Sequence, residues 1–349
     1  MDSVWMNKPW DMHVHLRQDE MLARVAKHTA AHFAGCYIMP NVKPPVWDAE
    51  TLHAYKSNVA KALGPDVIPL MSIKLLKETR ADTIKGAKEA GAYGCKLYPE
   101  GVTSHSQDSI PAAWLDPDNA WPDEWLSVLR AIKHNDLILN IHAETPGGRP
   151  LSRERTFIRT LDKIMEVVRP RIVIEHVSTM AMGEWVRRWS KLTPGDVGCT
   201  ITPQHLVMII DDLISDPHRG GKLTVHNHCW PCAKHPKDRK YLREFATSGE
   251  ACVWLGTDSA PWMPEDKWDG CAGCFNAPVA LATYAEVFDQ MDALERLVGF
   301  ASLHGQRFYR APTSKLGLSV VRQEWVVPDL IDGLVPWRAG HTLKWKVAD

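Results

Sequence analysis

The sequence predicts an α/β fold: a (β/α)8 barrel of the TIM type with long active-site loops and a C-terminal extension, in a single domain over residues 1–349. Three observations support this prediction. Eight short apolar runs rich in β-forming residues recur along the chain, and segments with helical apolar spacing lie between them. The length exceeds the roughly 250 residues of a typical barrel, which leaves room for insertions and an extension. No G-x-G-x-x-G turn follows an early run and no Pro/Gly/Ser linker divides the chain, which disfavours the rival arrangement of two doubly wound domains.

Several of the predicted strands are apolar throughout, as expected for strands buried on both faces. In chain order they are WDMHVH (10–15), GCYIMP (35–40), VIPLMSI (67–73), YGCKLY (93–98), LILNIH (137–142), RIVIEH (171–176), GCTIT (198–202) and ACVWLGTD (251–258). Apolar residues with i, i+3, i+4, i+7 spacing predict helices within 22–33, 125–132 and 281–291. Two connections, 99–122 and 204–236, are long, and the first has the composition of a lid.

The charge and the apolar pattern exclude two classes of protein. Lys and Arg total 41 against 42 for Asp and Glu, so the formal net charge is -1 and no general positive field attracts nucleic acid. No apolar run approaches the roughly 20 residues of a membrane-spanning helix. The N-terminus lacks the apolar core of a secretory signal, so we expect a cytoplasmic protein whose eight cysteines are mainly reduced.

Potential metal ligands lie at the ends of four predicted strands. Two histidines stand two apart in the first strand, so both side chains point to the same side. Because the C-terminal ends of all barrel strands meet at one mouth, imidazoles and carboxylates placed there converge on one site, and zinc prefers such ligands. These residues are His13, His15, His142, His176 and Asp258. Each one alone is also compatible with ordinary packing near the rim.

Lys96 lies in the fourth predicted strand, where a cation aimed at a metal cluster is unfavourable. Carbamylation by carbon dioxide resolves this conflict, because it converts the amine into an anion whose two oxygens can bridge two metal ions. A structural salt bridge from Lys96 to Glu144 or Asp258 is the alternative.

Eight motifs along the chain resemble those of one enzyme family. They are DMHVHLR, IMPN, GCKLYP, IHAE, EHVST, TITPQHL, GTDSAP and CAGCFNAP, in the family's order and spacing from about Trp10 to Val335. The sequence is thereby identified as similar to the dihydroorotases of the class found in enterobacteria, within the amidohydrolase superfamily. GTDSAP followed by CAGCFNAP is the most specific pair.

The resemblance implies a metal-dependent hydrolase of cyclic amides with two zinc ions per chain. His13, His15 and Asp258 would hold one ion, His142 and His176 the other, and carboxylated Lys96 would bridge them. Asp258 would also be catalytic, taking a proton from the attacking water and passing it to the leaving nitrogen. The reaction implied is the reversible ring opening of L-dihydroorotate to N-carbamoyl-L-aspartate in pyrimidine biosynthesis, by a homodimer.

The resemblance also implies a set of substrate contacts. Arg17 and Asn41 match residues that hold the substrate carboxylate, and a guanidinium suits that anion. Thr103 and Ser104 match a hydroxyl pair of the mobile loop. Asn227 and Ala272 match positions where backbone groups read the amides of the ring, although Asn227 replaces a residue that is usually apolar.

Trp262 departs from the family pattern, in which GTDSAP is followed by a histidine that contacts the carboxylate. An indole donates one hydrogen bond and carries no charge. The alternative function is therefore hydrolysis of a bulkier or aromatic-fused cyclic amide, imide or lactone in catabolism, with Trp230 and Trp268 adding to the pocket. An outward-facing Trp262 is the other possibility.

Two further readings stay open on the sequence. Cys229, Cys232, Cys271 and Cys274 resemble a structural zinc set or a redox pair, although the second two belong to the CAGC motif of the family. A barrel kept only as a structural partner of another pyrimidine enzyme is the non-catalytic reading, and the retained ligand residues disfavour it.

Overall fold

The computed structural model describes residues 2–215 and 221–348. Eight parallel strands form its central sheet in chain order, and each coincides with one of the predicted runs. They are β2 (Trp10–Val14), β3 (Gly35–Ile38), β4 (Ile68–Lys74), β5 (Ala92–Leu97), β6 (Ile138–Ile141), β7 (Ile172–Ile174), β8 (Val197–Ile201) and β9 (Val253–Leu255). The predicted (β/α)8 barrel is confirmed.

The first and last barrel strands meet at a short seam. A parallel bridge joins Val14 to Ser259, just beyond the end of β9. The backbone nitrogen of His15 donates to the carbonyl oxygen of Ser259 at 3.0 Å, and that of Asp258 donates to the carbonyl oxygen of His13 at 2.8 Å. The closure of the barrel therefore runs directly through predicted metal ligands.

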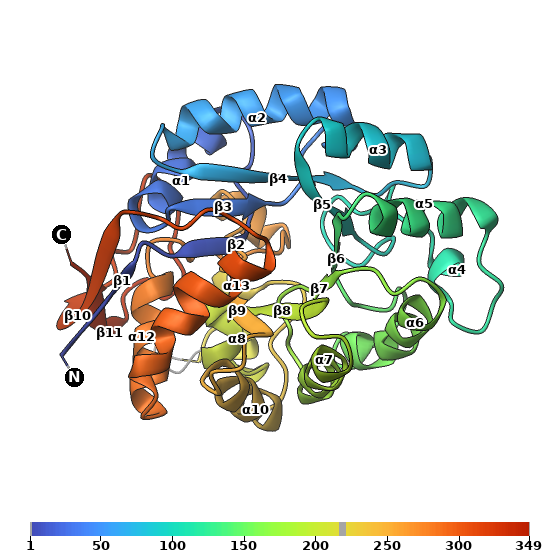
Figure 1. Ribbon diagram of the computed structural model, residues 1–349. Coiled ribbons are helices and arrows are strands. Elements are labelled where there is room, and N and C mark those ends of the chain that lie inside the picture. The colour runs from blue at the N-terminus through green and yellow to red at the C-terminus, as the bar shows by residue number, and fades with distance from the viewer. Residues whose placement is uncertain (1, 216–220, 349) are drawn as a thin grey trace.

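Amphipathic helices surround the barrel (Figure 1). The longer ones are α1 (Asp19–His32), α2 (Ala49–Leu63), α3 (Ala81–Glu89), α5 (Asp123–His134), α6 (Arg153–Val167), α7 (Met180–Leu192), α10 (Pro236–Ala246) and α12 (Ala280–Gln290). Helix α2 begins at a side-chain cap, because Asp48 accepts a hydrogen bond from the backbone nitrogen of Thr51. The apolar positions expected in α1, α5 and α12 are largely buried, so those three predicted helices are confirmed.

Short helices lie in the long connections and near the C-terminus. They are α4 (Ala112–Leu115), α8 (Pro203–Val207), α9 (Asp211–Ile214), η2 (Val225–Asn227), α11 (Pro264–Trp268), η3 (Leu294–Arg296), η4 (Gly299–Leu303) and α13 (His304–Phe308). No helix in the described part of the chain combines the length and apolar character needed to cross a membrane.

A second, antiparallel sheet was not predicted as such. It joins β1 (Ser3–Asn7) to the C-terminal extension, in the order β1, β10 (Gly317–Val326), β11 (Thr342–Val347). Figure 1 shows both termini beside this sheet. It is fixed to helix α12, because Glu286 accepts hydrogen bonds from Arg338 and from the backbone nitrogen of Lys344, both at 2.6 Å. The assignment of residues 1–349 to a single domain stays a prediction.

The interior of the barrel divides into an apolar and a polar part. Large side chains form one cluster, including Trp10, Tyr37, Leu70 and Trp254. Gly198 gives Trp254 its space, since a Cβ at that position would collide with the indole ring. Buried polar and charged residues gather at the C-terminal ends of the strands instead, which leaves that end of the barrel for chemistry.

Candidate metal centre

Three side chains converge at the seam of the barrel. The nitrogen and oxygen atoms that His13, His15 and Asp258 offer to a metal all lie within 4.8 Å of one another. Asp258 Oδ1 lies 3.3 Å from His13 Nε2 and 3.2 Å from His15 Nε2. The two histidines share one side of β2 because strand side chains alternate, and the seam brings Asp258 to that side. This is a possible cation site of the kind the sequence predicts.

Two more histidines adjoin this group. The ring centroids of His13 and His176 are 5.1 Å apart, and those of His142 and His176 are 4.7 Å apart. Both rings are buried. His176 and Asp258 have left-handed backbone conformations, with φ of 42° and 48°. Such conformations are costly for residues other than glycine and cluster at functional sites.

Lys96 is fully buried among these groups. Its Nζ has no hydrogen-bond partner among the described residues and lies 5.1 Å from the ring centroid of Tyr98. Burial lowers the pKa of Lys96 to about 8, which increases the fraction of neutral amine. The alternative of a salt bridge to Glu144 or Asp258 is not what the structure has, because within the described residues Lys96 Nζ pairs with neither carboxylate, and Glu144 lies 3.7 Å from Lys234 Nζ instead.

Buried carboxylates outside the site orient two of the histidines. Glu175 Oε2 lies 2.7 Å from His13 Nδ1, so the Nε2 of that ring points to the cluster. Glu144 Oε2 lies 2.9 Å from His142 Nε2, which leaves the Nδ1 of that ring for another contact. Partners of this kind fix the tautomer and orientation of metal-binding histidines. Neither glutamate was predicted to orient a histidine, although each lies within two residues of a predicted ligand.

Most protonation states at the site suit a cation. Burial lowers the pKa of His15 to about 4 and also lowers the pKa of His142 and of His176. The pKa of His13 is instead raised, because the carboxylates of Glu175 and Asp258 outweigh the effect of burial. Burial alone would raise the pKa of Asp258, but the neighbouring His13 and His15 hold it well below its usual range. Neutral imidazoles and an ionised carboxylate are the forms that bind metals.

Six of the seven predicted substrate contacts line one pocket together with the histidines and Asp258. They are Arg17, Asn41, Thr103, Ser104, Trp262 and Ala272. Trp230 lines the same pocket, in agreement with its suggested place there. Trp268, suggested for the same role, is 68% exposed and is not among the lining residues.

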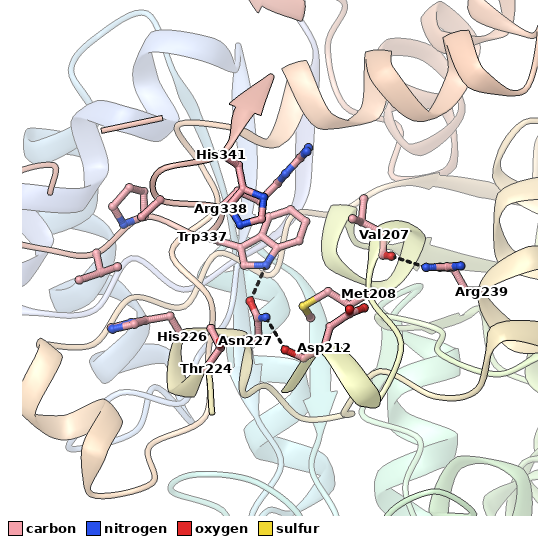
Figure 2. Close-up of a pocket in the computed structure, with 13 residues that line it drawn as sticks. Val207, Met208, Asp212, Thr224, His226, Asn227, Arg239, Trp337, Arg338 and His341 are labelled. Atoms are coloured by element: carbon pink, nitrogen blue, oxygen red, sulfur yellow. Dashed lines mark hydrogen bonds between the residues drawn. The ribbon is translucent and has the colours of Figure 1, made fainter. Parts of the chain in front are cut away.

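Asn227 is not among the residues that line this pocket. Its side chain lies in a separate cavity, shown in Figure 2, where Nδ2 donates to the carbonyl oxygen of Asp212 at 2.9 Å and Oδ1 accepts from Trp337 Nε1 at 3.1 Å. The next residue of the chain that lines the site is Trp230, three residues later. The side chain of Asn227 thus points away from the site, and the expected contact of its backbone groups with the ring stays a prediction.

The four cysteines near the pocket do not form a metal site. Within residues 2–215 and 221–348 they do not come together as a group of three or more possible ligands. All eight cysteines of the chain are free; the thiol of Cys229 donates to the carbonyl oxygen of Pro231 at 3.3 Å and that of Cys274 to the carbonyl oxygen of His226 at 3.4 Å. The structural zinc set is thus not what the described residues have, and the redox pair stays an untested alternative.

Comparisons with known proteins agree with this fold. No protein-family model matches the chain. A dihydroorotase from Marinobacter nauticus is 35% identical over 356 residues, with 99% of each chain covered. The chain belongs to the dihydroorotase family. The mitochondrial dihydroorotase of Arabidopsis thaliana is 34% identical and covers 98% of this chain and 90% of its own length.

A solved dihydroorotase has the same architecture. The crystal structure of dihydroorotase from Saccharomyces cerevisiae in complex with 5-fluoroorotic acid superposes with a TM-score of 0.89 and 30% identity. The match covers 100% of this chain and 99% of the yeast chain, so the dihydroorotase fold includes the unpredicted sheet of β1, β10 and β11 as well as the barrel.

Proposed function

We propose that this protein is a zinc-dependent dihydroorotase, which reversibly opens the ring of L-dihydroorotate to give N-carbamoyl-L-aspartate in pyrimidine biosynthesis. It is a hydrolase of the C–N bond in a cyclic amide. The observation that carries the proposal is one pocket in which a three-ligand cation site, two further histidines and Arg17 come together, in a chain whose relatives named dihydroorotase match over its full length.

The residues present fit two zinc ions. We assign His13, His15 and Asp258 to one ion and His142 and His176 to the other, with carboxylated Lys96 between them. Unpartnered buried atoms support this assignment: His13 Nε2, His176 Nδ1 and Lys96 Nζ lack a hydrogen bond within the described residues. When bound, such a pair of ions polarises the scissile carbonyl and lowers the pKa of water.

Asp258 is the group that moves the proton. Its carboxylate is ionised and held between His13 and His15, so it can accept a proton from the attacking water at Oδ1 or Oδ2. Water oxygen joins the ring carbonyl carbon, the C–N bond breaks, and Asp258 passes the proton to the departing nitrogen. The reverse sequence closes the ring.

The remaining pocket residues bind and shield the ring. Arg17, whose buried Nη2 has no partner among the described residues, suits the substrate carboxylate, and Asn41 lines the same pocket. Thr103 and Ser104 of the 99–122 connection and Ala272 line it as well. Together they orient the ring and exclude water from the reacting atoms.

The alternative of a bulkier ring is not favoured. It was based on the flat, uncharged indole of Trp262 beside the metals, and that ring packs on Arg17 while its Nε1 donates to the carbonyl oxygen of Ala272 at 2.9 Å. The full-length relatives are dihydroorotases by name.

The test is ring opening of L-dihydroorotate by the purified, zinc-loaded protein, followed by ultraviolet absorbance. We expect kcat/KM above about 10⁴ M⁻¹s⁻¹ for the wild type and a loss of at least about 100-fold for Asp258→Asn. Turnover of aryl-fused lactams or imides with none of dihydroorotate would overturn the proposal.

The proposed assembly and location need separate measurements. We propose a homodimer, tested by sedimentation of the purified protein, and a cytoplasmic location, tested by fractionation of the source cells. Relatives named mitochondrial make the second test informative.

A further inference from the structure

Arg17 is held on three sides in the pocket. Its Nε donates to the carbonyl oxygen of Pro261 at 2.9 Å, and its Cζ lies 4.3 Å from the ring centroid of Trp262. Its backbone has a left-handed φ of 60°, and Tyr55 Oη donates to its carbonyl oxygen at 2.7 Å. A flexible side chain is thus fixed from its backbone to its guanidinium.

One corner of this guanidinium is left for a ligand. Nη2 is buried and has no hydrogen-bond partner among the described residues, and burial lowers the pKa of Arg17 to about 10 without discharging it near neutral pH. A buried charged donor without a partner is unfavourable unless an anion completes it. Arg17 lines the pocket, so that anion is a group of the bound ring.

Trp262 is itself rigidly placed. Its Nε1 donates to the carbonyl oxygen of Ala272 at 2.9 Å. The segment that follows Ala272 is held in place, because Lys267 Nζ donates to the carbonyl oxygen of Gly273 at 2.7 Å and the backbone nitrogen of Ala260 donates to the carbonyl oxygen of Cys274 at 2.8 Å. The indole therefore forms a fixed aromatic surface against which the guanidinium packs.

We propose that Trp262 is a positioning residue: it sets the orientation of Arg17, and through Arg17 it determines the preference of this site for rings that carry a carboxylate. This inference rests on the proposed function. Trp262 does not serve as a carboxylate donor, because its single N–H is used on Ala272. It acts through its face, where a desolvated cation over an indole is attracted to the ring.

The ring of His105, in the 99–122 connection, also contacts the indole of Trp262. Its ring centroid lies 5.7 Å from that of Trp262, and Lys74 Nζ holds its carbonyl oxygen at 2.8 Å. Trp262 thus contacts both Arg17 and the loop that carries Thr103 and Ser104. Loss of the Trp262 indole would therefore free the guanidinium without removing a group that touches the reacting carbonyl.

The experiment is a double-mutant cycle between Trp262→Leu and Arg17→Ala in the zinc-loaded full chain. We expect Trp262→Leu to raise KM for L-dihydroorotate about 10-fold, equivalent to about 1.4 kcal/mol, with kcat changed less than about 3-fold. In the Arg17→Ala background the same substitution should change KM less than about 2-fold, because no guanidinium remains to be positioned. Equal effects in the two backgrounds would overturn the inference.

Two variants separate stacking from other effects. Trp262→Phe keeps an aromatic face but loses the N–H, so it should recover most of the affinity that Trp262→Leu loses. Trp268→Leu removes an exposed indole from the same region and should leave KM unchanged. A Trp262→Phe variant as weak as Trp262→Leu would show that the hydrogen bond to Ala272, and not the face of the ring, supports binding.

Calorimetric binding of orotate gives a second measure that needs no turnover. Trp262→Leu should weaken orotate about 10-fold and should change the affinity for uracil, the ring without the carboxylate, less than about 2-fold. An equal loss for both rings contradicts the inference. Wild-type protein that binds orotate but does not open dihydroorotate contradicts the proposed function alone.

Discussion

Replacing Glu175 by glutamine is expected to weaken zinc binding by the intact barrel. The carboxylate is fully buried and accepts three hydrogen bonds: from His13 Nδ1 and Thr200 Oγ1 at 2.7 Å, and from Asn140 Nδ2 at 2.6 Å. A glutamine offers one oxygen and one NH2 group in the same place. If its oxygen faces His13 and Thr200, its NH2 faces the donor Nδ2 of Asn140.

Turning the amide of Asn140 would resolve this conflict only if two hydroxyls reversed their hydrogen bonds, because Oδ1 accepts from Tyr37 Oη and Nδ2 donates to Tyr309 Oη, each at 2.6 Å. A buried donor left unsatisfied costs about 1–3 kcal/mol, so the metal-free variant should also be less stable. Loss of a charged partner behind a metal-binding histidine lowers metal affinity by about 10- to 100-fold, or about 1.4–2.7 kcal/mol. We expect a zinc affinity lower by this factor in Glu175→Gln.

The assay is competition for zinc between the metal-free protein and a chromophoric chelator, with thermal unfolding of each metal-free variant as a separate measure of stability. Glu154→Gln is the matched control. Glu154 is also buried, its Oε1 accepts from the backbone nitrogen of Ser178 at 2.8 Å, and burial raises its pKa to about 7, so an amide resembles its protonated form. Wild-type zinc affinity in Glu175→Gln, or an equal loss in Glu154→Gln, would refute the reasoning.

The remaining predictions concern the bridging lysine and the wall of the pocket. Lys96→Ala should abolish most ring opening, with partial recovery on addition of short carboxylic acids; near-normal activity would contradict a carbamate bridge. Because burial lowers the pKa of Lys96 to about 8, reactivation of metal-depleted protein by zinc at a constant concentration of dissolved carbon dioxide should accelerate as the pH rises from about 7 to about 9, since the neutral amine is the form that reacts with carbon dioxide. A rate that does not rise over this range argues against that amine. Gly273→Ala should lower the thermal midpoint more than Gly147→Ala, because both glycines have positive φ, of 145° and 71°, but only at Gly273 would a Cβ collide with Ala260. Equal midpoints would show that the pocket wall adjusts without cost.

The barrel could be predicted from sequence because its strands are buried on both faces. Continuous apolar runs such as Ile172–Ile174 indicate this burial directly. The sheet of β1, β10 and β11 carries a weaker signal, since Ser3–Asn7 is only five residues long and alternates exposed with buried positions. Its pairing joins the two ends of the chain, and no local pattern specifies a partner so far away in sequence.

The metal ligands could be predicted because each stands at the end of a strand, where the fold dictates the direction of the side chain. Asn227 lies on an irregular connection, where spacing from a motif does not determine the direction of a side chain; its side chain lies in a separate cavity, and the expected backbone contact stays a prediction. The hydrogen bond from Trp262 Nε1 to the carbonyl oxygen of Ala272 could not be predicted from the sequence either, because it depends on how two loops pack together.

The seam between β2 and β9 brings together ligand residues that lie far apart in the sequence. His13 and His15 are synthesised at the beginning and Asp258 near the end, and the hydrogen bonds that bring them together are those that close the barrel. A chain that stops before β9 therefore lacks both a closed barrel and a complete cation site. A metal ion held across the seam would stabilise the pairing of β2 with β9. Release of the ion would then be coupled to opening of the first and last strands.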